Sequence, residues 1–156
     1  MLSSRAWRSI VAGLCGSAAH SVLMAVKSWS GVLPGFEPYN DLQALLASMA
    51  GGSIHPVIPW ALSYFNGSVV LGFLFNRLHR HIPGRTALAK GLGFGLAIWI
   101  VMGLTFFPVI GKGLFALGAG FGLKPVFFSL LMVLTYSITL SSVYFVLRLP
   151  GRPSAS

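Results

Sequence analysis

Four apolar stretches, each long enough to cross a bilayer as a helix, constrain this chain more than any other feature. They run from about Ile10 to Leu33, Val57 to Phe75, Gly91 to Ile110 and Val126 to Leu147. A hydrocarbon core needs roughly 20 helical residues, and an open strand cannot satisfy its backbone hydrogen bonds in lipid. The sequence therefore predicts an all-α integral membrane four-helix bundle, with residues 1–156 forming a single four-span domain.

The polar residues are too few for a water-soluble domain of this size. Charged residues make up 8% of the chain and hydrophobic residues 55%. A soluble globule needs a much larger charged surface. A single cysteine, Cys15, also allows no internal disulfide. These observations exclude a soluble enzyme, a disordered chain and a disulfide scaffold.

The basic residues predict the orientation of the spans. Eight of the eleven lie before the first span, between the second and third, or after the fourth: Arg5, Arg8, Arg77, Arg80, Arg85, Lys90, Arg148 and Arg152. By the positive-inside rule, both termini then face the cytoplasm, as expected in a bacterial inner membrane. Within the middle loop, Arg77, Arg80, Arg85 and Lys90 are predicted to contact lipid headgroups. The net charge of +9 is therefore attributed to topology, not to nucleic-acid binding.

Two segments between spans have patterns of their own. Leu42, Leu45, Leu46 and Met49 follow the spacing of one apolar helix face, and Asn40 or Asp41 is a suitable cap. The pattern predicts a short amphipathic helix on the outer membrane surface. The glycine-rich segment 111–122 is predicted to be an ordered hairpin or a shallow re-entrant loop instead of a helix.

Catalytic groups are scarce. Glu37 and Asp41 are the only carboxylates, and no spacing places a histidine or cysteine beside them. An acid–base or nucleophilic enzyme is therefore not expected, and no metal site is predicted.

His20 lies near the middle of the first span, on a stripe of the helix that includes Gly13, Gly16 and Ser17. One interpretation makes His20 an axial ligand of a haem or bacteriochlorophyll, with Gly16 leaving room for the flat ring. The other makes it a histidine hydrogen-bonded to a neighbouring helix. The second is preferred because the other three histidines lie at the ends of spans.

Asn66 lies at the centre of the second span, on a predicted face with Trp60, Ser63 and Gly67. An unpaired amide is costly in hydrocarbon, so a partner is expected on the fourth helix, from Thr135, Tyr136 or Thr139. An alternative is that Asn66 lines the path of a small transported solute. Gly91 and Gly95 of the third span are predicted to pack closely against another helix.

The chain resembles an uncharacterised family of small bacterial four-helix membrane proteins from about Ala12 to Tyr144. The similarity lies in glycine-rich and aromatic motifs: Ala12-Gly13 through Met24 and Lys27, Gly31-Val32-Leu33-Pro34, Trp60 through Gly67, Pro83-Gly84, Lys90-Gly91 with Gly93 to Gly95, Pro108 with Gly111, Gly113-Leu114-Phe115, and Tyr136 to Tyr144. The resemblance implies four spans, an inner-membrane location and no established activity. It also implies histidines where this chain has Ser63 and Val133, so His20 alone would hold any tetrapyrrole.

These observations favour a structural or accessory subunit that docks against a larger respiratory or photosynthetic membrane complex. The basis is the lack of a catalytic set and of intramembrane acids, together with abundant small residues for helix packing. The alternative is a ligand-binding subunit, with a tetrapyrrole on His20 or a solute path along Asn66.

Overall fold

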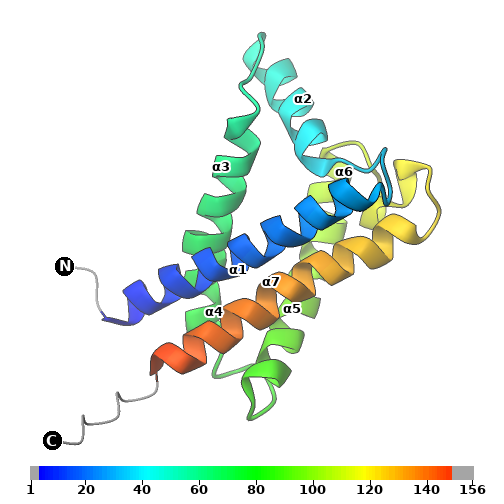
Figure 1. Cartoon of the computed structure of the whole chain (residues 1–156). Helices are drawn as coiled ribbons and strands as arrows, with labels where there is room; N and C mark the ends of the chain where they lie inside the picture. The colour runs from blue at the N-terminus through cyan, green and yellow to red at the C-terminus, as the bar shows by residue number, and fades with distance from the viewer. Residues whose placement is uncertain (1–3, 149–156) are drawn as a thin grey trace, which may run out of the picture.

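A computed structural model describes residues 4–148, and this part of the chain is helical with no strand. Figure 1 shows the arrangement of the helices. In chain order these are α1 (Ser4–Ser30), α2 (Pro38–Ala50), α3 (Val57–Phe65), the π-helix η1 (Asn66–Leu71), α4 (Gly72–Leu78), α5 (Ala87–Leu104), α6 (Phe106–Val109), the 3₁₀ helix η2 (Leu114–Ala119) and α7 (Lys124–Arg148).

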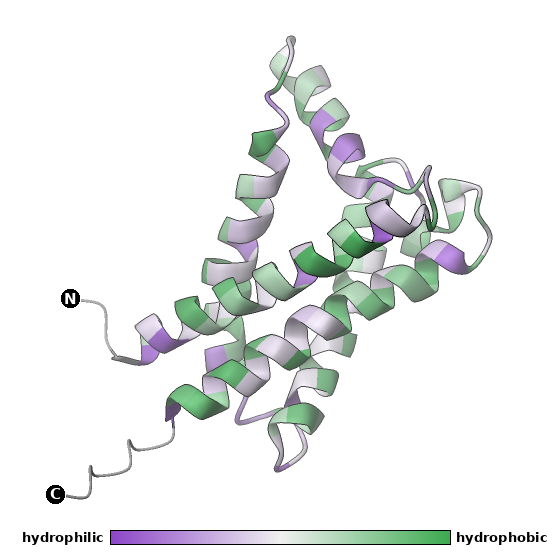
Figure 2. Cartoon of the chain, in the orientation of Figure 1, coloured by the Kyte–Doolittle hydropathy of each residue, from purple (hydrophilic) through white to green (hydrophobic). Residues whose placement is uncertain are grey.

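The predicted all-α class with four membrane-length helices is confirmed. Four helical stretches are long and apolar enough to cross a membrane: Arg5–Ser30, Val57–Leu78, Ala87–Val109 and Lys124–Arg148. Figure 2 shows that most of their residues are apolar or intermediate in hydropathy and that α2 carries several hydrophilic residues. The first span begins before Ile10 and ends before the expected Leu33, because Gly31 takes a left-handed conformation with φ of 66°.

α1 and α7 form the centre of the bundle. They lie side by side, α5 packs along α7, and the second span contacts α1 mainly through η1 and α4 (Figure 1). Phe75, Phe94, Leu140 and Tyr144 form the core of the end where the termini and the α4–α5 loop lie. At the other end α3 diverges from α1, and α2 connects the two.

Glycines permit the closest helix crossings. A Cβ on Gly13 would lie 2.6 Å from the Gly67 carbonyl oxygen and 2.6 Å from the Ser68 Cα. Similarly, a Cβ on Gly16 would meet the Tyr136 ring at 2.8 Å. α1 thus approaches the backbone of η1 more closely than any residue with a side chain would allow.

α5 meets α7 in the same manner. A Cβ on Gly91 would lie 2.9 Å from the Ile138 Cα, and one on Gly95 would lie 3.1 Å from the Ser137 side chain. The stripe of small residues in the third span is therefore an α5–α7 contact surface.

The amphipathic helix is present as α2, but its start differs from the prediction. Glu37 occupies the cap position without a capping side-chain bond, and Pro38 is the first helical residue. Asn40 and Asp41 therefore lie inside the first turn, because a proline at the first position begins the helix earlier. Leu42 and Leu45 pack against the second core cluster, which consists of Leu33, Phe36, Phe107, Ile110 and Ala116.

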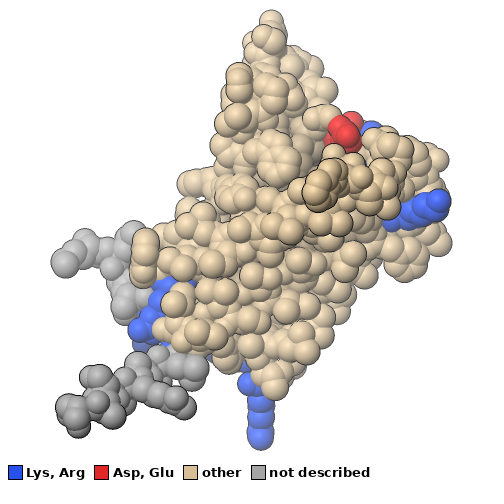
Figure 3. Space-filling model, in the orientation of Figure 1, with Lys and Arg blue, Asp and Glu red and all other residues tan. Residues whose placement is uncertain are grey.

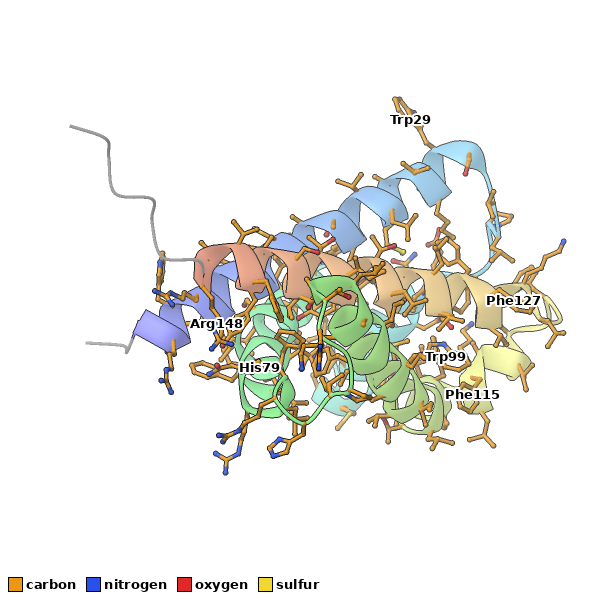
Figure 4. All side chains as sticks on the ribbon, turned by 90° about the horizontal axis from the view of Figure 1, so that it is seen from below. Trp29, His79, Trp99, Phe115, Phe127 and Arg148 are labelled. Carbon is orange, nitrogen blue, oxygen red and sulfur yellow. The ribbon has the colours of Figure 1, made fainter. Side chains whose placement is uncertain are left out.

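The glycine-rich segment contains a short 3₁₀ helix, η2, which the sequence did not predict. Glycines at positive φ, including Gly113 and Gly120, bend the backbone on either side of it. Ala116 is fully buried, and the Phe115 ring lies 4.8 Å from the Trp99 ring of α5 (Figure 4). Lys112 pairs with Asp41 of α2 at 3.1 Å, so this segment is fastened to two helices.

Candidate functional site

A polar cluster joins α1, α2 and α3 at the end of the bundle where these helices diverge. The Tyr39 hydroxyl lies 3.0 Å from Nε2 of His20 and 2.9 Å from Oγ of Ser63. A single phenol of α2 therefore connects two membrane-spanning helices.

Aromatic packing holds Tyr39 in this position. Its ring stacks on Trp60 of α3 with 4.2 Å between centroids and 15° between planes. One turn along α3, the Tyr64 hydroxyl lies 2.8 Å from Oγ of Ser21 in α1. Burial raises the pKa of Tyr39, so its hydroxyl stays protonated at neutral pH and keeps one proton to donate.

The cluster bears directly on His20 as a tetrapyrrole ligand. Its Nε2 is already within hydrogen-bond distance of Tyr39, so an axial bond from that atom would require the phenol to move first. The bonding of His20 matches the preferred alternative, a histidine hydrogen-bonded to a neighbouring helix.

The predicted partners of Asn66 do not contact its side chain. Asn66 lies on an exposed face of the second span, and no hydrogen bond reaches its amide within the described chain. Thr135 and Thr139 donate to carbonyls of their own helix, at 2.8 Å each. The predicted bond between Asn66 and the fourth helix is therefore wrong.

Tyr136 instead bonds the residue after Asn66. Its hydroxyl donates to the Gly67 carbonyl at 2.6 Å, inside the π-helix. Ser17 of α1 lies against Gly67 as well, since a Cβ added there would collide with the serine hydroxyl. The predicted contact between the second and fourth spans thus exists, but it uses a backbone group.

A second polar cluster lies at the opposite end. His79 Nδ1 donates to the Asn76 carbonyl at 2.6 Å, and its Nε2 accepts from Arg148 at 2.7 Å. Figure 4 shows His79 and Arg148 close together. Tyr144 packs on the His79 ring and donates to the Asn76 side chain. These contacts fasten α4 to the end of α7.

Lys90 belongs to this cluster too, which corrects one of the predicted headgroup contacts. Its amine donates to the carbonyls of His79 and Ile82, closing the loop after α4. Arg77, Arg80 and Arg85 are exposed, so they remain available to headgroups. Figure 3 shows basic side chains at the end where α1 begins and α7 ends, and further basic side chains at the opposite end, where the acidic ones lie.

The state of His79 should make stability depend on pH. Burial, reinforced by the charges of Arg148 and Lys90, lowers its pKa. The neutral ring is favoured in the folded state, so this stabilisation is complete above the unfolded pKa of about 6.5 and is lost as the pH falls through the lower folded value. We expect acidification to lower the free energy of unfolding by less than about 1 kcal/mol after solvent screening, and the melting temperature to fall with it.

This dependence is measured by thermal melting in detergent at a series of pH values. His79→Gln should reduce the fall in melting temperature at acidic pH. His81→Gln, a substitution of the exposed histidine in the same loop, should leave that fall unchanged. Equal curves for wild type and His79→Gln would contradict the assignment.

A comparison with known families matches residues 3–154 to one model. The chain belongs to DUF6789, a family of unknown function. No curated protein and no solved structure matches it. The family assignment agrees with the resemblance drawn from the glycine and aromatic motifs, and it names no ligand, partner or reaction.

Sequence reasoning placed Trp60 on the face of Asn66 and singled out His20 and Ser63, but it missed Tyr39, whose hydroxyl lies within hydrogen-bond distance of those two. Tyr39 is separated from them by 19 and 24 positions, so no local spacing relates these residues. The position of Tyr39 directly after Pro38, at the start of an amphipathic helix, was the sole indication that it points toward the bundle.

Proposed function

We propose that this protein is a non-enzymatic accessory subunit of the bacterial inner membrane, which docks against a transmembrane helix of a larger complex. The observation on which this depends is Asn66. Its amide lies exposed near the centre of the span Val57–Leu78, with no hydrogen bond from residues 4–148. In hydrocarbon such a group costs several kcal/mol, and a polar group on a neighbouring helix removes that cost.

The surroundings of Asn66 support a helix as its partner. Leu62, Phe65, Val70 and Phe73 are exposed around it, with exposed fractions of 46%, 59%, 48% and 37%. They form a broad apolar surface on α3, η1 and α4 with one amide near its centre. Interfaces in membranes combine close van der Waals packing with a few interhelical hydrogen bonds, and this surface offers both.

The way the second span is attached also supports docking. It contacts α1 mainly through η1 and α4, whereas α3 leans toward α2 (Figure 1). One long side of α3 is therefore left without a helix from this chain. A partner helix on that side would bury apolar surface and satisfy the Asn66 amide together.

The distribution of charge supports the orientation that we propose. Eight of the eleven basic residues lie in the segments before the first span, between the second and third, and after the fourth, whereas Glu37 and Asp41 lie at the other end with Lys27, Lys112 and Lys124. By the positive-inside rule the termini then face the cytoplasm. The docking surface around Asn66 is near the middle of the membrane in either orientation.

The solute-transport alternative has less support from the same residue. Asn66 faces outward, and its neighbour Gly67 is the residue buried in the bundle. A path for a polar solute requires polar side chains along a shared interior route, which an outward amide does not provide.

The test is co-purification of the tagged full chain from its native membrane in mild detergent. We expect wild type to bring down a stable set of membrane proteins, and Asn66→Leu to reduce their recovery about tenfold, which corresponds to the loss of one buried hydrogen bond with its partner left unpaired. Thr135→Val is the matched control, because the Thr135 hydroxyl bonds its own helix at Leu131.

Two outcomes would overturn the proposal. One is a wild-type protein that purifies alone from native membrane, with other complexes assembling normally in a deletion strain. The other is an Asn66→Leu variant that retains the same partners in the same amounts.

A further inference from the structure

A groove of about 350 Å³ opens between the last turns of α1, the start of α2 and the first turn of α3. Its walls are both polar and apolar, and they include two opposite charges. The residues that line it are Ser21, Met24, Ala25, Lys27, Ser28, Glu37, Tyr39, Asn40 and Trp60. The groove adjoins the His20–Tyr39–Ser63 cluster, but the function proposed above does not use it.

Lys27 contributes a cation that forms no ion pair among residues 4–148, although the charge of Glu37 acts on it from a longer distance. The residue is 5% exposed, and its amine donates to the Phe36 carbonyl. An ammonium group has three donors, so this bond leaves two for other partners. No carboxylate of the described chain lies within 4.0 Å of it. A buried cation beside an open groove is stabilised by an anion that enters the groove.

Glu37 contributes the opposite charge on another wall. Its side chain is exposed and accepts a hydrogen bond from Asn40. Lys112, the nearby cation on the glycine-rich segment, pairs with Asp41 instead, at 3.1 Å. Glu37 is therefore a carboxylate that, among residues 4–148, has no cation within 4.0 Å.

An aromatic wall accompanies this carboxylate. Trp60 is 37% exposed and stacks on Tyr39 beside the groove. A tryptophan face together with a carboxylate is a recurrent environment for ammonium groups, because the ring quadrupole and the anion both attract the cation. The groove thus offers a site for an anion at Lys27 and a site for an ammonium group at Glu37 and Trp60.

We propose that this groove binds the headgroup of a zwitterionic phospholipid that bears an ammonium group. The phosphate lies at the Lys27 amine, and the ammonium lies between Glu37 and Trp60. Each charge of the headgroup then lies beside an opposite charge of the groove. A purely anionic or purely cationic headgroup would satisfy only one of the two.

A lipid fits better than a free zwitterion because the groove continues onto apolar surface. Met24 and Ala25 line its floor, and Val22 and Val26 are exposed on the adjoining face of α1 at 64% and 52%. Acyl chains would run along this face toward the membrane centre. The groove lies near the end of α1, the depth at which headgroups of one leaflet are found.

The experiment measures lipid retention by native mass spectrometry of the full chain purified from nanodiscs containing equal amounts of phosphatidylethanolamine and phosphatidylglycerol. Wild type should retain phosphatidylethanolamine about tenfold more than phosphatidylglycerol, as expected for one ammonium held by a carboxylate and a ring. Glu37→Gln should remove this preference. Asp41→Asn, at the chain's other carboxylate, should preserve it, since Asp41 pairs with Lys112 outside the groove.

A second variant separates binding from folding. Lys27→Met removes the bond to Phe36 and can unfold the protein, whereas Ala25→Trp fills the groove from an exposed helix position. Ala25→Trp should lose bound phosphatidylethanolamine with an unchanged melting temperature. Equal retention of the two lipids by wild type, or the same loss in Asp41→Asn as in Glu37→Gln, overturns the proposal. So does displacement of the lipid by soluble phosphoethanolamine, which would assign the groove to a free zwitterion.

Discussion

Replacing Gly13 with leucine should prevent the helices from packing into the folded bundle. Even a Cβ at this position would lie 2.6 Å from the Gly67 carbonyl oxygen and 2.6 Å from the Ser68 Cα. These are backbone atoms, which cannot rotate away as a side chain can. Overpacking against them should lower stability by at least about 3 kcal/mol. The measurement is thermal unfolding in detergent, with size-exclusion chromatography to detect aggregation.

Gly52 provides the matched control for this substitution. Nothing lies within 4 Å of a Cβ added there. Gly52→Leu should therefore melt within a degree or so of wild type, as is usual for exposed positions. If Gly13→Leu also melted like wild type, the close crossing between α1 and the π-helix would be refuted.

Tyr39→Phe should produce the second largest loss of stability. The substitution keeps the ring, and hence the stacking on Trp60, but removes the hydroxyl that lies between His20 and Ser63. Two half-buried polar groups then lose their partner together. We expect a destabilisation of about 2 kcal/mol, from the two lost bonds and the desolvation of the groups left behind.

Unfolding of the detergent-solubilised protein tests this expectation. Tyr64→Phe is the control, because among residues 4–148 that hydroxyl has one partner, Ser21, and the loss of stability should be about half as large. In a double-mutant cycle, Ser63→Ala should cost less in the Tyr39→Phe background than in wild type. Strict additivity would mean that Tyr39 and Ser63 are not coupled.

The four spans could be predicted because a run of apolar residues long enough to cross a bilayer leaves little choice of structure. The start of α2 could not be placed as well. Asn40 and Asp41 are better capping residues than Glu37, but Pro38 fixes a helical φ and begins the helix before them.

The orientation of Asn66 could not be predicted, for a physical reason. A regular helix places Asn66 on one face with Ser63 and Gly67, but the backbone from Asn66 to Leu71 forms a π-helix. Its wider turns change the angular position of each residue relative to an α-helix. Gly67 is buried and Asn66 is exposed, so the fourth span bonds the Gly67 carbonyl and Asn66 has no hydrogen-bond partner among residues 4–148.

Lys90 illustrates a different limit. Its place in a basic loop predicted a headgroup contact, since charge alone indicates only which side of the membrane a residue prefers. Whether the amine points to lipid or to backbone depends on how the chain turns after α4. Here the amine donates hydrogen bonds to two backbone carbonyls of that turn.

The pairing of α1 with α7 has a consequence for biogenesis. Among the described helices, α1 is synthesised first, and it makes its most extensive contact with α7, which is synthesised last (Figure 1). Until α7 has entered the bilayer, α1 presents its glycine surface to lipid, chaperones or other nascent helices. Contacts so distant in sequence form late, so a chain interrupted before α7 should be recognised and degraded rather than accumulate as a three-helix intermediate.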